Sequence, residues 1–231
     1  MQAVIMAGGK GKRLRDVISD IPKPLVPISG RPLLDYIIDH LKRNGCDNII
    51  ICTGYLSDKI KEHVKKSDYG VPVRLSKEDK PLGTAGALHQ VKNFLDEDFL
   101  VLFGDIFTTM DIAKLLRFHL GNRADCTLVV RKTEHPLDSN LVTINKNWTV
   151  KKLYFKPHKI IPSSYGLAAI YVLNPKVLKL LPKRTPFDLE KDFLPLLLRQ
   201  EKKLVCYNTD EFIQDIGTPE RYKKILQLFK I

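Results

Sequence analysis

A glycine-rich, basic segment near the N-terminus has the composition of a phosphate-binding loop. The apolar run 3–6 is followed by GGKGKR at residues 8–13, and PKP follows at residues 22–24. Glycines without a Cβ let successive backbone N–H groups turn toward one anion, and a flanking Arg and Lys add positive charge. The segment therefore predicts a binding site for a polyphosphate.

Two common phosphate-binding loops do not fit this segment. A Walker A loop needs Gly, four residues and then Gly-Lys-Ser/Thr, which no register supplies. A dinucleotide fingerprint started at Gly9 would need glycine where Leu14 stands. A solvated Lys/Gly turn is the remaining alternative to another kind of phosphate site.

Two carboxylates and one lysine add to the chemistry. Asp105 follows the apolar strand predicted at 99–103, and open α/β sheets bind ligands at the carboxyl ends of their strands. Asp215 precedes a predicted helix start at 218–220. Helix capping explains residues 218–220 but assigns no role to Asp215. Lys156 lies on an extended segment.

No nucleophile and base stand out as a pair in the sequence. A reaction that joins two phosphates needs no general base, because the attacking oxygen is already ionised and charge repulsion is the main barrier. Two carboxylates could hold a Mg²⁺ that keeps several waters and bridges phosphate oxygens.

Strand and helix patterns alternate along the chain, which predicts an α/β fold with a mostly parallel sheet and helices on both faces. An amphipathic helix opens at Pro32 and ends at Gly45, with its apolar side chains spaced for one face. Strands are predicted at 48–52, 71–75, 99–103, 127–130, 165–173 and 203–207, and helices at 57–66, 111–120 and 187–200, the last shortened or kinked by Pro195. The alternating segments of 141–155 around Asn145-Lys146-Asn147 predict a small antiparallel lobe.

The composition predicts one soluble domain of 231 residues, with 44% apolar residues and no apolar stretch long enough to cross a bilayer. The four cysteines are scattered without a CxxC pair, so reduced thiols, the cytoplasm and no cysteine metal site are expected. The net charge of +12 favours anionic partners, but Lys and Arg are dispersed and do not form a nucleic-acid-binding run.

Taken in order, GGKGKR, PKP, PLGTAGA, Gly104-Asp105 and FIQDIGTPERY resemble the sugar-1-phosphate nucleotidylyltransferase family over nearly the whole chain. The resemblance implies a Rossmann-like fold and Mg²⁺-dependent transfer of a nucleotidyl group from a nucleoside triphosphate to a sugar 1-phosphate, with release of pyrophosphate. It implies a nucleotide half at about 1–135 and a sugar-phosphate half at about 136–231, and it allows a homodimer.

The family's roles can be carried over residue by residue. Arg13 and Lys23 would be catalytic, acting on the leaving pyrophosphate and on the phosphates around the reacting phosphorus. Asp105 and Asp215 would bind Mg²⁺, and Lys156 would grip the sugar phosphate. The nucleotide-binding positions would be Ala7, Gly8, Gly9, Gly11, Lys12, Glu78, Gly83 and Thr84. Glu190 and Asp192 are assigned only a scaffold role.

Three departures from the family pattern concern the substrates. Lys12 stands where Thr or Ser is usual, Phe155 replaces the Glu of Glu-Lys-Pro, and residues 167–169 read Leu-Ala-Ala instead of Asn-Ala-Gly. PLGTAGA makes the chain most similar to short mannose- or heptose-1-phosphate guanylyltransferases. A uridylyltransferase or a non-catalytic nucleotide-sugar-binding module remains as an alternative, because the residues alone do not separate GTP from UTP.

Overall fold

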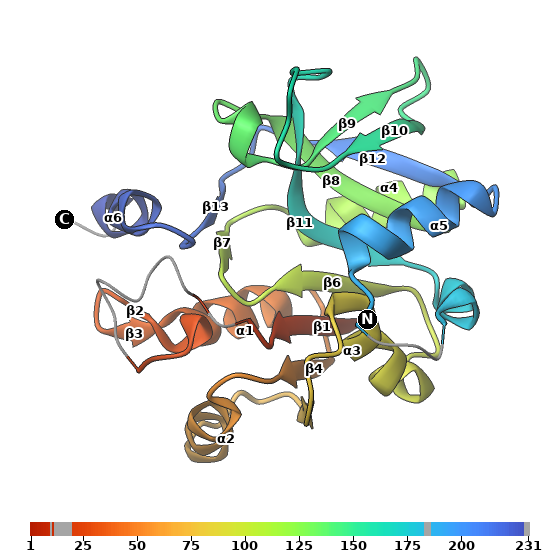
Figure 1. Cartoon of the computed structure of the whole chain (residues 1–231). Helices are drawn as coiled ribbons and strands as arrows, with labels where there is room; N and C mark the ends of the chain where they lie inside the picture. The colour runs from red at the N-terminus through yellow and green to blue at the C-terminus, as the bar shows by residue number, and fades with distance from the viewer. Residues whose placement is uncertain (10, 12–19, 183–185, 229–231) are drawn as a thin grey trace. The chain divides into compact units, whose positions relative to one another are not determined.

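The computed structural model describes residues 1–9, 11, 20–182 and 186–228 (Figure 1). By its internal contacts the chain divides into two compact units. Unit 1 consists of Met1–Leu82, Val101–Asp111 and Glu211–Ile231, and unit 2 of Gly83–Leu100 and Ile112–Asp210. Within the described ranges, no helix combines the length and the apolar character that crossing a membrane requires.

Unit 1 is built on parallel strands. β1 pairs in parallel with β4, and β4 pairs in parallel with β5, while β6 neighbours β1 on its other side. The elements of this unit are β1 (Gln2–Ala7), η2 (Lys23–Leu25), β2 (Pro27–Ile28), β3 (Arg31–Pro32), α1 (Leu33–Arg43), β4 (Asn48–Thr53), α2 (Ser57–Lys66), β5 (Val73–Lys77), β7 (Ile106–Thr108), β13 (Ile213–Asp215) and α6 (Pro219–Leu228). β6 (Phe99–Phe103) begins in unit 2, and its residues from Val101 onward belong to unit 1.

The burial of β1 and of one face of α1 follows from the sequence of unit 1. Every residue of β1 is buried, as expected for a strand that is covered on both faces. Helix α1 begins directly after Pro32 and buries the apolar positions of one face, which are Leu33, Leu34, Ile37, Ile38 and Leu41.

A two-stranded antiparallel ribbon joins distant parts of unit 1. β13 pairs with β7, so that Asp215 lies opposite Ile106, and Ile216 N–H donates to the Asp105 carbonyl at 2.9 Å. The ribbon therefore brings Asp215 next to Asp105 along the backbone, although more than a hundred residues separate them in the sequence.

Unit 2 combines antiparallel and parallel strand pairs. β8 pairs antiparallel with β11 and parallel with β12, and β9 pairs antiparallel with β10. Its elements are α3 (Thr84–Val91), η3 (Lys92–Phe94), α4 (Ile112–Asn122), β8 (Cys126–Lys132), η4 (Pro136–Asp138), β9 (Leu141–Ile144), β10 (Val150–Tyr154), β11 (Tyr165–Leu173), η5 (Pro175–Leu180), η6 (Leu189–Phe193), α5 (Leu194–Arg199) and β12 (Leu204–Asn208). The predicted α/β class, the parallel strands and the antiparallel 141–155 segment are confirmed.

In two predicted elements a proline explains the difference from the prediction. β5 begins at Val73 instead of residue 71, after Pro72, which has no N–H to give to a strand ladder. The helix predicted at 187–200 begins as a π-helix over Leu189–Phe193 and becomes α-helical at Leu194. Pro195 cannot donate to the carbonyl four residues earlier, so the helix changes its hydrogen-bonding pattern just before this residue.

Strand β11 contains a strained residue. Ala169 has φ of 56°, and the register between β11 and β8 shifts between Leu167 and Tyr171. This left-handed conformation costs a residue with a Cβ about 1–2 kcal/mol. The family pattern has glycine at this position, so the Ala169 departure places strain in the backbone of β11.

We expect Ala169→Gly to raise the free energy of unfolding by about 1 kcal/mol, because glycine adopts a positive φ without steric cost. Urea unfolding monitored by circular dichroism measures the change. The neighbouring variant Ala168→Gly is the control, and it should lower stability because Ala168 is buried and has no positive φ. A loss of stability in both variants would contradict this explanation of Ala169.

Candidate functional site

Three residues follow directly after the parallel strands of unit 1 and lie in one row. The register aligns Ala7, Thr53 and Lys77, the last residues of β1, β4 and β5. Gly8, Gly54 and Glu78 are the next residues along each strand. The predicted nucleotide-binding residues Ala7, Gly8 and Glu78 are thus brought together at the carboxyl edge of the sheet, where open α/β sheets bind ligands.

Glu78 packs against the glycine backbone of this row. A Cβ on Gly8 would lie 2.8 Å from Glu78 Oε1, and a Cβ on Gly54 would collide with the same oxygen. Glu78 Oε2 accepts a hydrogen bond from Leu82 N–H at 3.0 Å. Any side chain at Gly8 or Gly54 would therefore displace the Glu78 carboxylate. Glycine at these two positions leaves the space that the carboxylate occupies.

The remaining residues of the glycine-rich loop lie next to Lys23 or outside the described part. Gly9 is exposed. Gly11 has φ of +60°, and a Cβ on Gly11 would lie 3.2 Å from Lys23 Cγ. The predicted site residues Lys12 and Arg13 lie outside the described residues, so their roles stay predictions.

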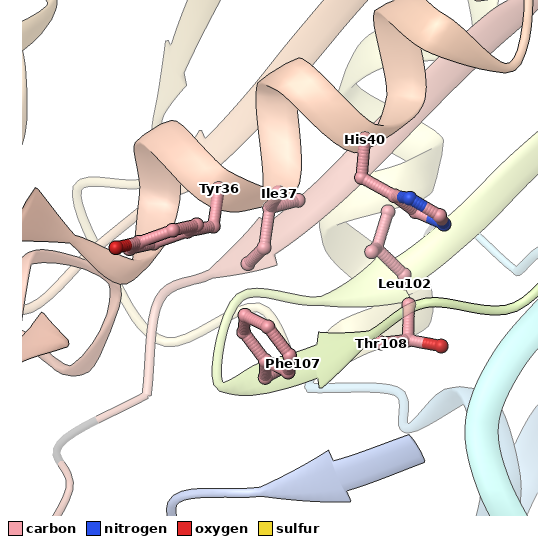
Figure 2. A pocket seen from close by; sticks show the side chains of 6 residues that line it. All are labelled: Tyr36, Ile37, His40, Leu102, Phe107 and Thr108. Atoms are coloured by element: carbon pink, nitrogen blue, oxygen red, sulfur yellow. The ribbon is translucent and has the colours of Figure 1, made fainter. Parts of the chain in front are cut away.

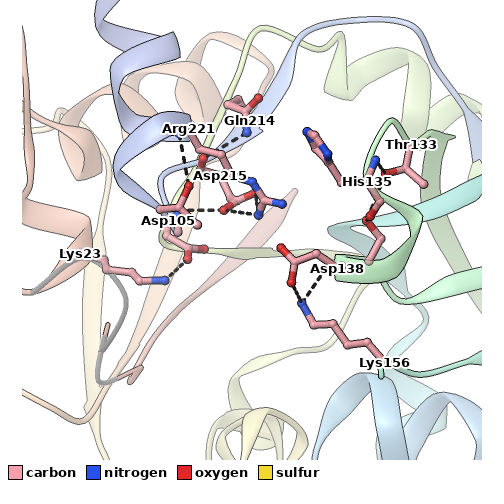
Figure 3. A network of polar contacts seen from close by, with 12 residues as sticks. Lys23, Asp105, Thr133, His135, Asp138, Lys156, Gln214, Asp215 and Arg221 are labelled. Atoms are coloured by element: carbon pink, nitrogen blue, oxygen red, sulfur yellow. Dashed lines mark hydrogen bonds and ion pairs between the residues drawn. The ribbon is translucent and has the colours of Figure 1, made fainter. Parts of the chain in front are cut away.

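Lys23 and Asp105 form an ion pair in unit 1. Lys23 Nζ donates to Asp105 Oδ2 at 2.5 Å, and both side chains are about one-fifth exposed (Figure 3). Lys23 opens η2, and Asp105 follows β6, so the predicted phosphate lysine and the predicted metal carboxylate meet across 82 residues. The burial of both partners keeps their attraction less screened than at a fully solvated surface.

Asp215 has an unexpected partner, Arg221. Arg221 Nη1 lies 3.1 Å from Asp215 Oδ1 and 2.9 Å from Oδ2, as Figure 3 shows. Gly217 N–H also donates to Asp215 Oδ1 at 2.8 Å. The sequence predicts a helix start at 218–220 but no partner for Asp215. The only signal for that partner is a basic residue, Arg221, six positions after Asp215.

Gly83 and Thr84, predicted to bind nucleotide, have packing partners within unit 2. Gly83 has φ of +73°, and a Cβ there would lie 2.5 Å from the Phe187 carbonyl oxygen. Thr84 Oγ1 donates to Asp188 at 2.9 Å and accepts from Leu189 N–H at 2.7 Å. The small residues of PLGTAGA therefore permit close packing of α3 on the 187–189 segment, and their nucleotide role stays a prediction.

Lys156 is held by a loop of unit 2. Lys156 Nζ donates to the Asp138 carbonyl at 2.7 Å and to Asp138 Oδ1 at 3.1 Å (Figure 3). Lys156 N–H donates to Asn140 Oδ1 at 3.2 Å, and His158 Nε2 contacts the Ser139 carbonyl at 2.7 Å. The 138–140 segment thus fixes both the backbone and the ammonium group of Lys156. No sequence pattern indicates this role for residues 138–140.

A half-buried carboxylate, that of Glu190, supports this loop. Glu190 accepts hydrogen bonds from Tyr171 Oη and from Asn140 Nδ2. Burial raises the pKa of Glu190, whereas the hydrogen bonds from Tyr171 and Asn140 act in the opposite direction. Glu190 is therefore linked through Asn140 to the backbone of Lys156, which gives its scaffold role a physical basis.

A small pocket in unit 1 offers little to a ligand. Figure 2 shows its lining by Tyr36, Ile37, His40, Leu102, Phe107 and Thr108. His40 Nε2 contacts the Met110 carbonyl at 2.9 Å, and Thr108 Oγ1 donates to the Phe212 carbonyl at 2.8 Å. The Tyr36 hydroxyl donates to the Ile28 carbonyl at 3.1 Å, so all three polar side chains of the lining are engaged by the main chain. The pocket is therefore explained by the packing of α1 on β6 and β7.

The described residues form no cluster of three or more His, Cys, Asp or Glu that could hold a metal ion. Asp105 and Asp215, the predicted metal ligands, therefore belong to no larger cluster of such side chains in this part of the chain. A hard cation at this pair would complete its coordination with water and ligand oxygens.

Comparison with known proteins gives a consistent result. The family model described as Nucleotidyl transferase matches residues 2–229. The chain is 31% identical over 225 residues to D-glycero-alpha-D-manno-heptose 1-phosphate guanylyltransferase from Aneurinibacillus thermoaerophilus, covering 97% of this chain and 96% of that protein. It is also 31% identical to mannose-1-phosphate guanyltransferase from Pichia angusta, over 96% of this chain but 62% of that longer protein.

Among solved structures, the chain is similar to HddC from Yersinia pseudotuberculosis complexed with GMP-PN. The TM-score is 0.85 at 30% sequence identity, and the alignment covers 99% of each chain.

Proposed function

We propose that this chain, which belongs to the nucleotidyl transferase family, is a guanylyltransferase that acts on a sugar 1-phosphate of the mannose or heptose type. It would transfer a guanylyl group from GTP to the acceptor, giving a GDP-sugar and pyrophosphate. These substrates are supported by the names of two similar proteins, a heptose 1-phosphate guanylyltransferase and a mannose-1-phosphate guanyltransferase. The observation that carries the proposal is the edge of parallel strands in unit 1, which bears Gly8, Glu78 and the Lys23–Asp105 pair.

Glu78 favours guanine over uracil on chemical grounds. Guanine presents two adjacent donors, N1–H and the N2 amino group, and one carboxylate can accept from both. Uracil presents a single N3–H between two carbonyl oxygens, which a carboxylate would repel. A site built to bond particular polar groups rejects the analogue that lacks them. Glu78 therefore supports GTP as the nucleotide, and UTP as the weaker alternative.

The proposed reaction is an in-line phosphoryl substitution. An oxygen of the sugar 1-phosphate attacks the α-phosphorus of GTP, a new phosphorus–oxygen bond forms, and the bond to the bridging oxygen of the leaving pyrophosphate breaks. The attacking oxygen is ionised at neutral pH, so no general base is required. Lys23 would stabilise negative charge on the triphosphate, and Lys156 would hold the acceptor phosphate.

The two carboxylates of unit 1 fit a magnesium ion. Mg²⁺ in nucleotide enzymes is bound by one or two carboxylates together with waters and substrate phosphates, which matches Asp105 and Asp215. When bound, the ion would neutralise charge on the phosphate oxygens. The chain's own contribution is to hold the two carboxylates together through the β7–β13 ribbon.

The test is a substrate screen that follows pyrophosphate. Four nucleoside triphosphates are combined with mannose 1-phosphate, heptose 1-phosphate and glucose 1-phosphate in the presence of Mg²⁺. We expect the greatest release with GTP and a mannose- or heptose-type acceptor. Preference for UTP would replace the proposal with a uridylyltransferase, and no release with any pair would favour a binding module without turnover.

We expect Glu78→Gln to lower kcat/KM for GTP by about tenfold, because one charge-assisted hydrogen bond to guanine would be weakened. The activity with UTP relative to GTP should rise, since an amide can both donate and accept. The control is Asp79→Asn, an exposed residue next in the sequence, which should leave the nucleotide preference unchanged. Equal GTP:UTP ratios in Glu78→Gln and the unchanged protein would remove Glu78 from base recognition.

We also propose a cytoplasmic location. Cys46, Cys52, Cys126 and Cys206 are all buried and belong to no disulfide, which suits a reducing compartment. Burial raises the pKa of the Cys52 and Cys206 thiols to about 12, so neither is poised to react as a thiolate.

A further inference from the structure

The two carboxylates assigned to the metal are already neutralised by cations of the chain itself. Asp105 pairs with Lys23, and Asp215 pairs with Arg221 through both of its oxygens. The four groups together carry no net charge. The side chains of these residues are between one-fifth and three-tenths exposed, so the ion pairs are only partly screened by solvent.

The position of Arg221 makes its contact with Asp215 a built feature of the fold. Asp215 ends β13, and Arg221 lies in the first turn of α6. The intervening turn is fixed by Gly217 N–H, which donates to Asp215, and by Tyr222 N–H, which donates to the Thr218 carbonyl at 3.0 Å. The guanidinium and the carboxylate are thus held on either side of one short turn.

A divalent cation that approaches alone faces an unfavourable exchange. Binding to Asp215 would separate the carboxylate from Arg221 and break the ion pair between Arg221 Nη1 and Asp215 Oδ2, which is 2.9 Å long. A polyphosphate changes this balance, because a guanidinium binds phosphate oxygens with the same paired geometry that it uses for a carboxylate. Because the described residues form no cluster of three or more His, Cys, Asp or Glu, the cation would take its remaining ligands from water and from phosphate oxygens.

We propose that Arg221 is an internal counter-cation of Asp215 that competes with the divalent metal and is transferred to a phosphate when the metal and nucleotide bind together. The inference rests on the proposed function, because the metal is the cofactor of that reaction. Arg221 is therefore a positioning residue that suppresses metal binding in the absence of nucleotide.

The test is a Mn²⁺ titration of the free protein, followed by electron paramagnetic resonance of unbound Mn²⁺. Arg221→Met should bind Mn²⁺ about tenfold more tightly than the unchanged protein, since a charge-assisted competitor has been removed. Arg221→Gln, which keeps a weaker hydrogen bond to Asp215, should show a smaller gain. When GTP is added, the affinity of the unchanged protein for Mn²⁺ should increase by a larger factor than that of Arg221→Met.

Lys224→Met is the matched control, because Lys224 is exposed on the same helix and its loss changes the net charge equally. Its Mn²⁺ affinity should stay close to that of the unchanged protein. Unchanged or weaker Mn²⁺ binding by both Arg221 variants would overturn the proposal, and so would an equal gain in Lys224→Met. The titration needs no turnover, so its outcome is independent of whether GTP and a sugar 1-phosphate give pyrophosphate.

Discussion

Replacing Asp215 with Asn is expected to lower Mg²⁺-dependent pyrophosphate release by about a hundred- to thousandfold. The substitution keeps the volume of the side chain and its bond from Gly217 but removes the charge that would hold the metal. Losing one group that organises charge in the transition state costs roughly 2.7–4 kcal/mol, which corresponds to this loss in rate. The measurement is the rate of release across a range of Mg²⁺ concentrations.

Melting temperature, measured on the same samples, separates the metal role from a structural one. A helix-start role alone would lower the melting temperature and leave turnover near normal. Asp105→Asn should reproduce the loss of turnover, whereas Asp210→Asn, an exposed residue shortly before β13, should retain full activity. Turnover of Asp215→Asn at the unchanged rate and low Mg²⁺ would show that the metal is bound elsewhere.

Lys156→Ala is expected to reduce kcat/KM for the sugar 1-phosphate by about ten- to hundredfold, with a much smaller effect on the requirement for GTP. The physical reason is the loss of a charge-assisted contact with the acceptor phosphate, worth roughly 1.5–3 kcal/mol. Initial rates measured while each substrate is varied separately give the two values.

The contacts of Lys156 supply a control for this prediction. Lys152→Ala removes an exposed lysine from β10, just before Lys156, and should change neither substrate requirement. Equal effects of Lys156→Ala on GTP and on the acceptor would instead indicate that Lys156 supports the fold through Asp138.

Much of the fold could be predicted because its signals are local. The buried β1, the amphipathic α1 and the antiparallel pairing of β9 with β10 follow from residue periodicity and turn residues. The short strands β7 and β13 escaped prediction, since three residues carry no periodicity and their pairing links segments a hundred residues apart. The family resemblance seen in the ordered motifs is confirmed by the match over residues 2–229.

The candidate site was predicted less completely than the fold. Motif order singled out Lys23, Asp105 and Asp215, but it did not predict the ion pair between Lys23 and Asp105 or the partner of Asp215, because side-chain partners depend on three-dimensional contacts. Arg221 and Asp138 belong to no motif that indicates a charge partner. In the PLGTAGA stretch, Gly83 is required by the close approach of the Phe187 backbone whether or not it also contacts a base, so small residues alone do not separate packing from nucleotide binding.

The β7–β13 ribbon can form only late in synthesis, because β13 follows unit 2 in the sequence. Unit 1 contains the first 82 residues, yet its second carboxylate arrives only with β13. A ribosome synthesises the chain from its N-terminus, and early segments begin to fold before later ones exist. The glycine-rich loop and Asp105 therefore emerge well before Asp215, and a nascent chain shorter than about 215 residues has half of the carboxylate pair. The two carboxylates of the proposed metal site can therefore come together only after unit 2 has been synthesised.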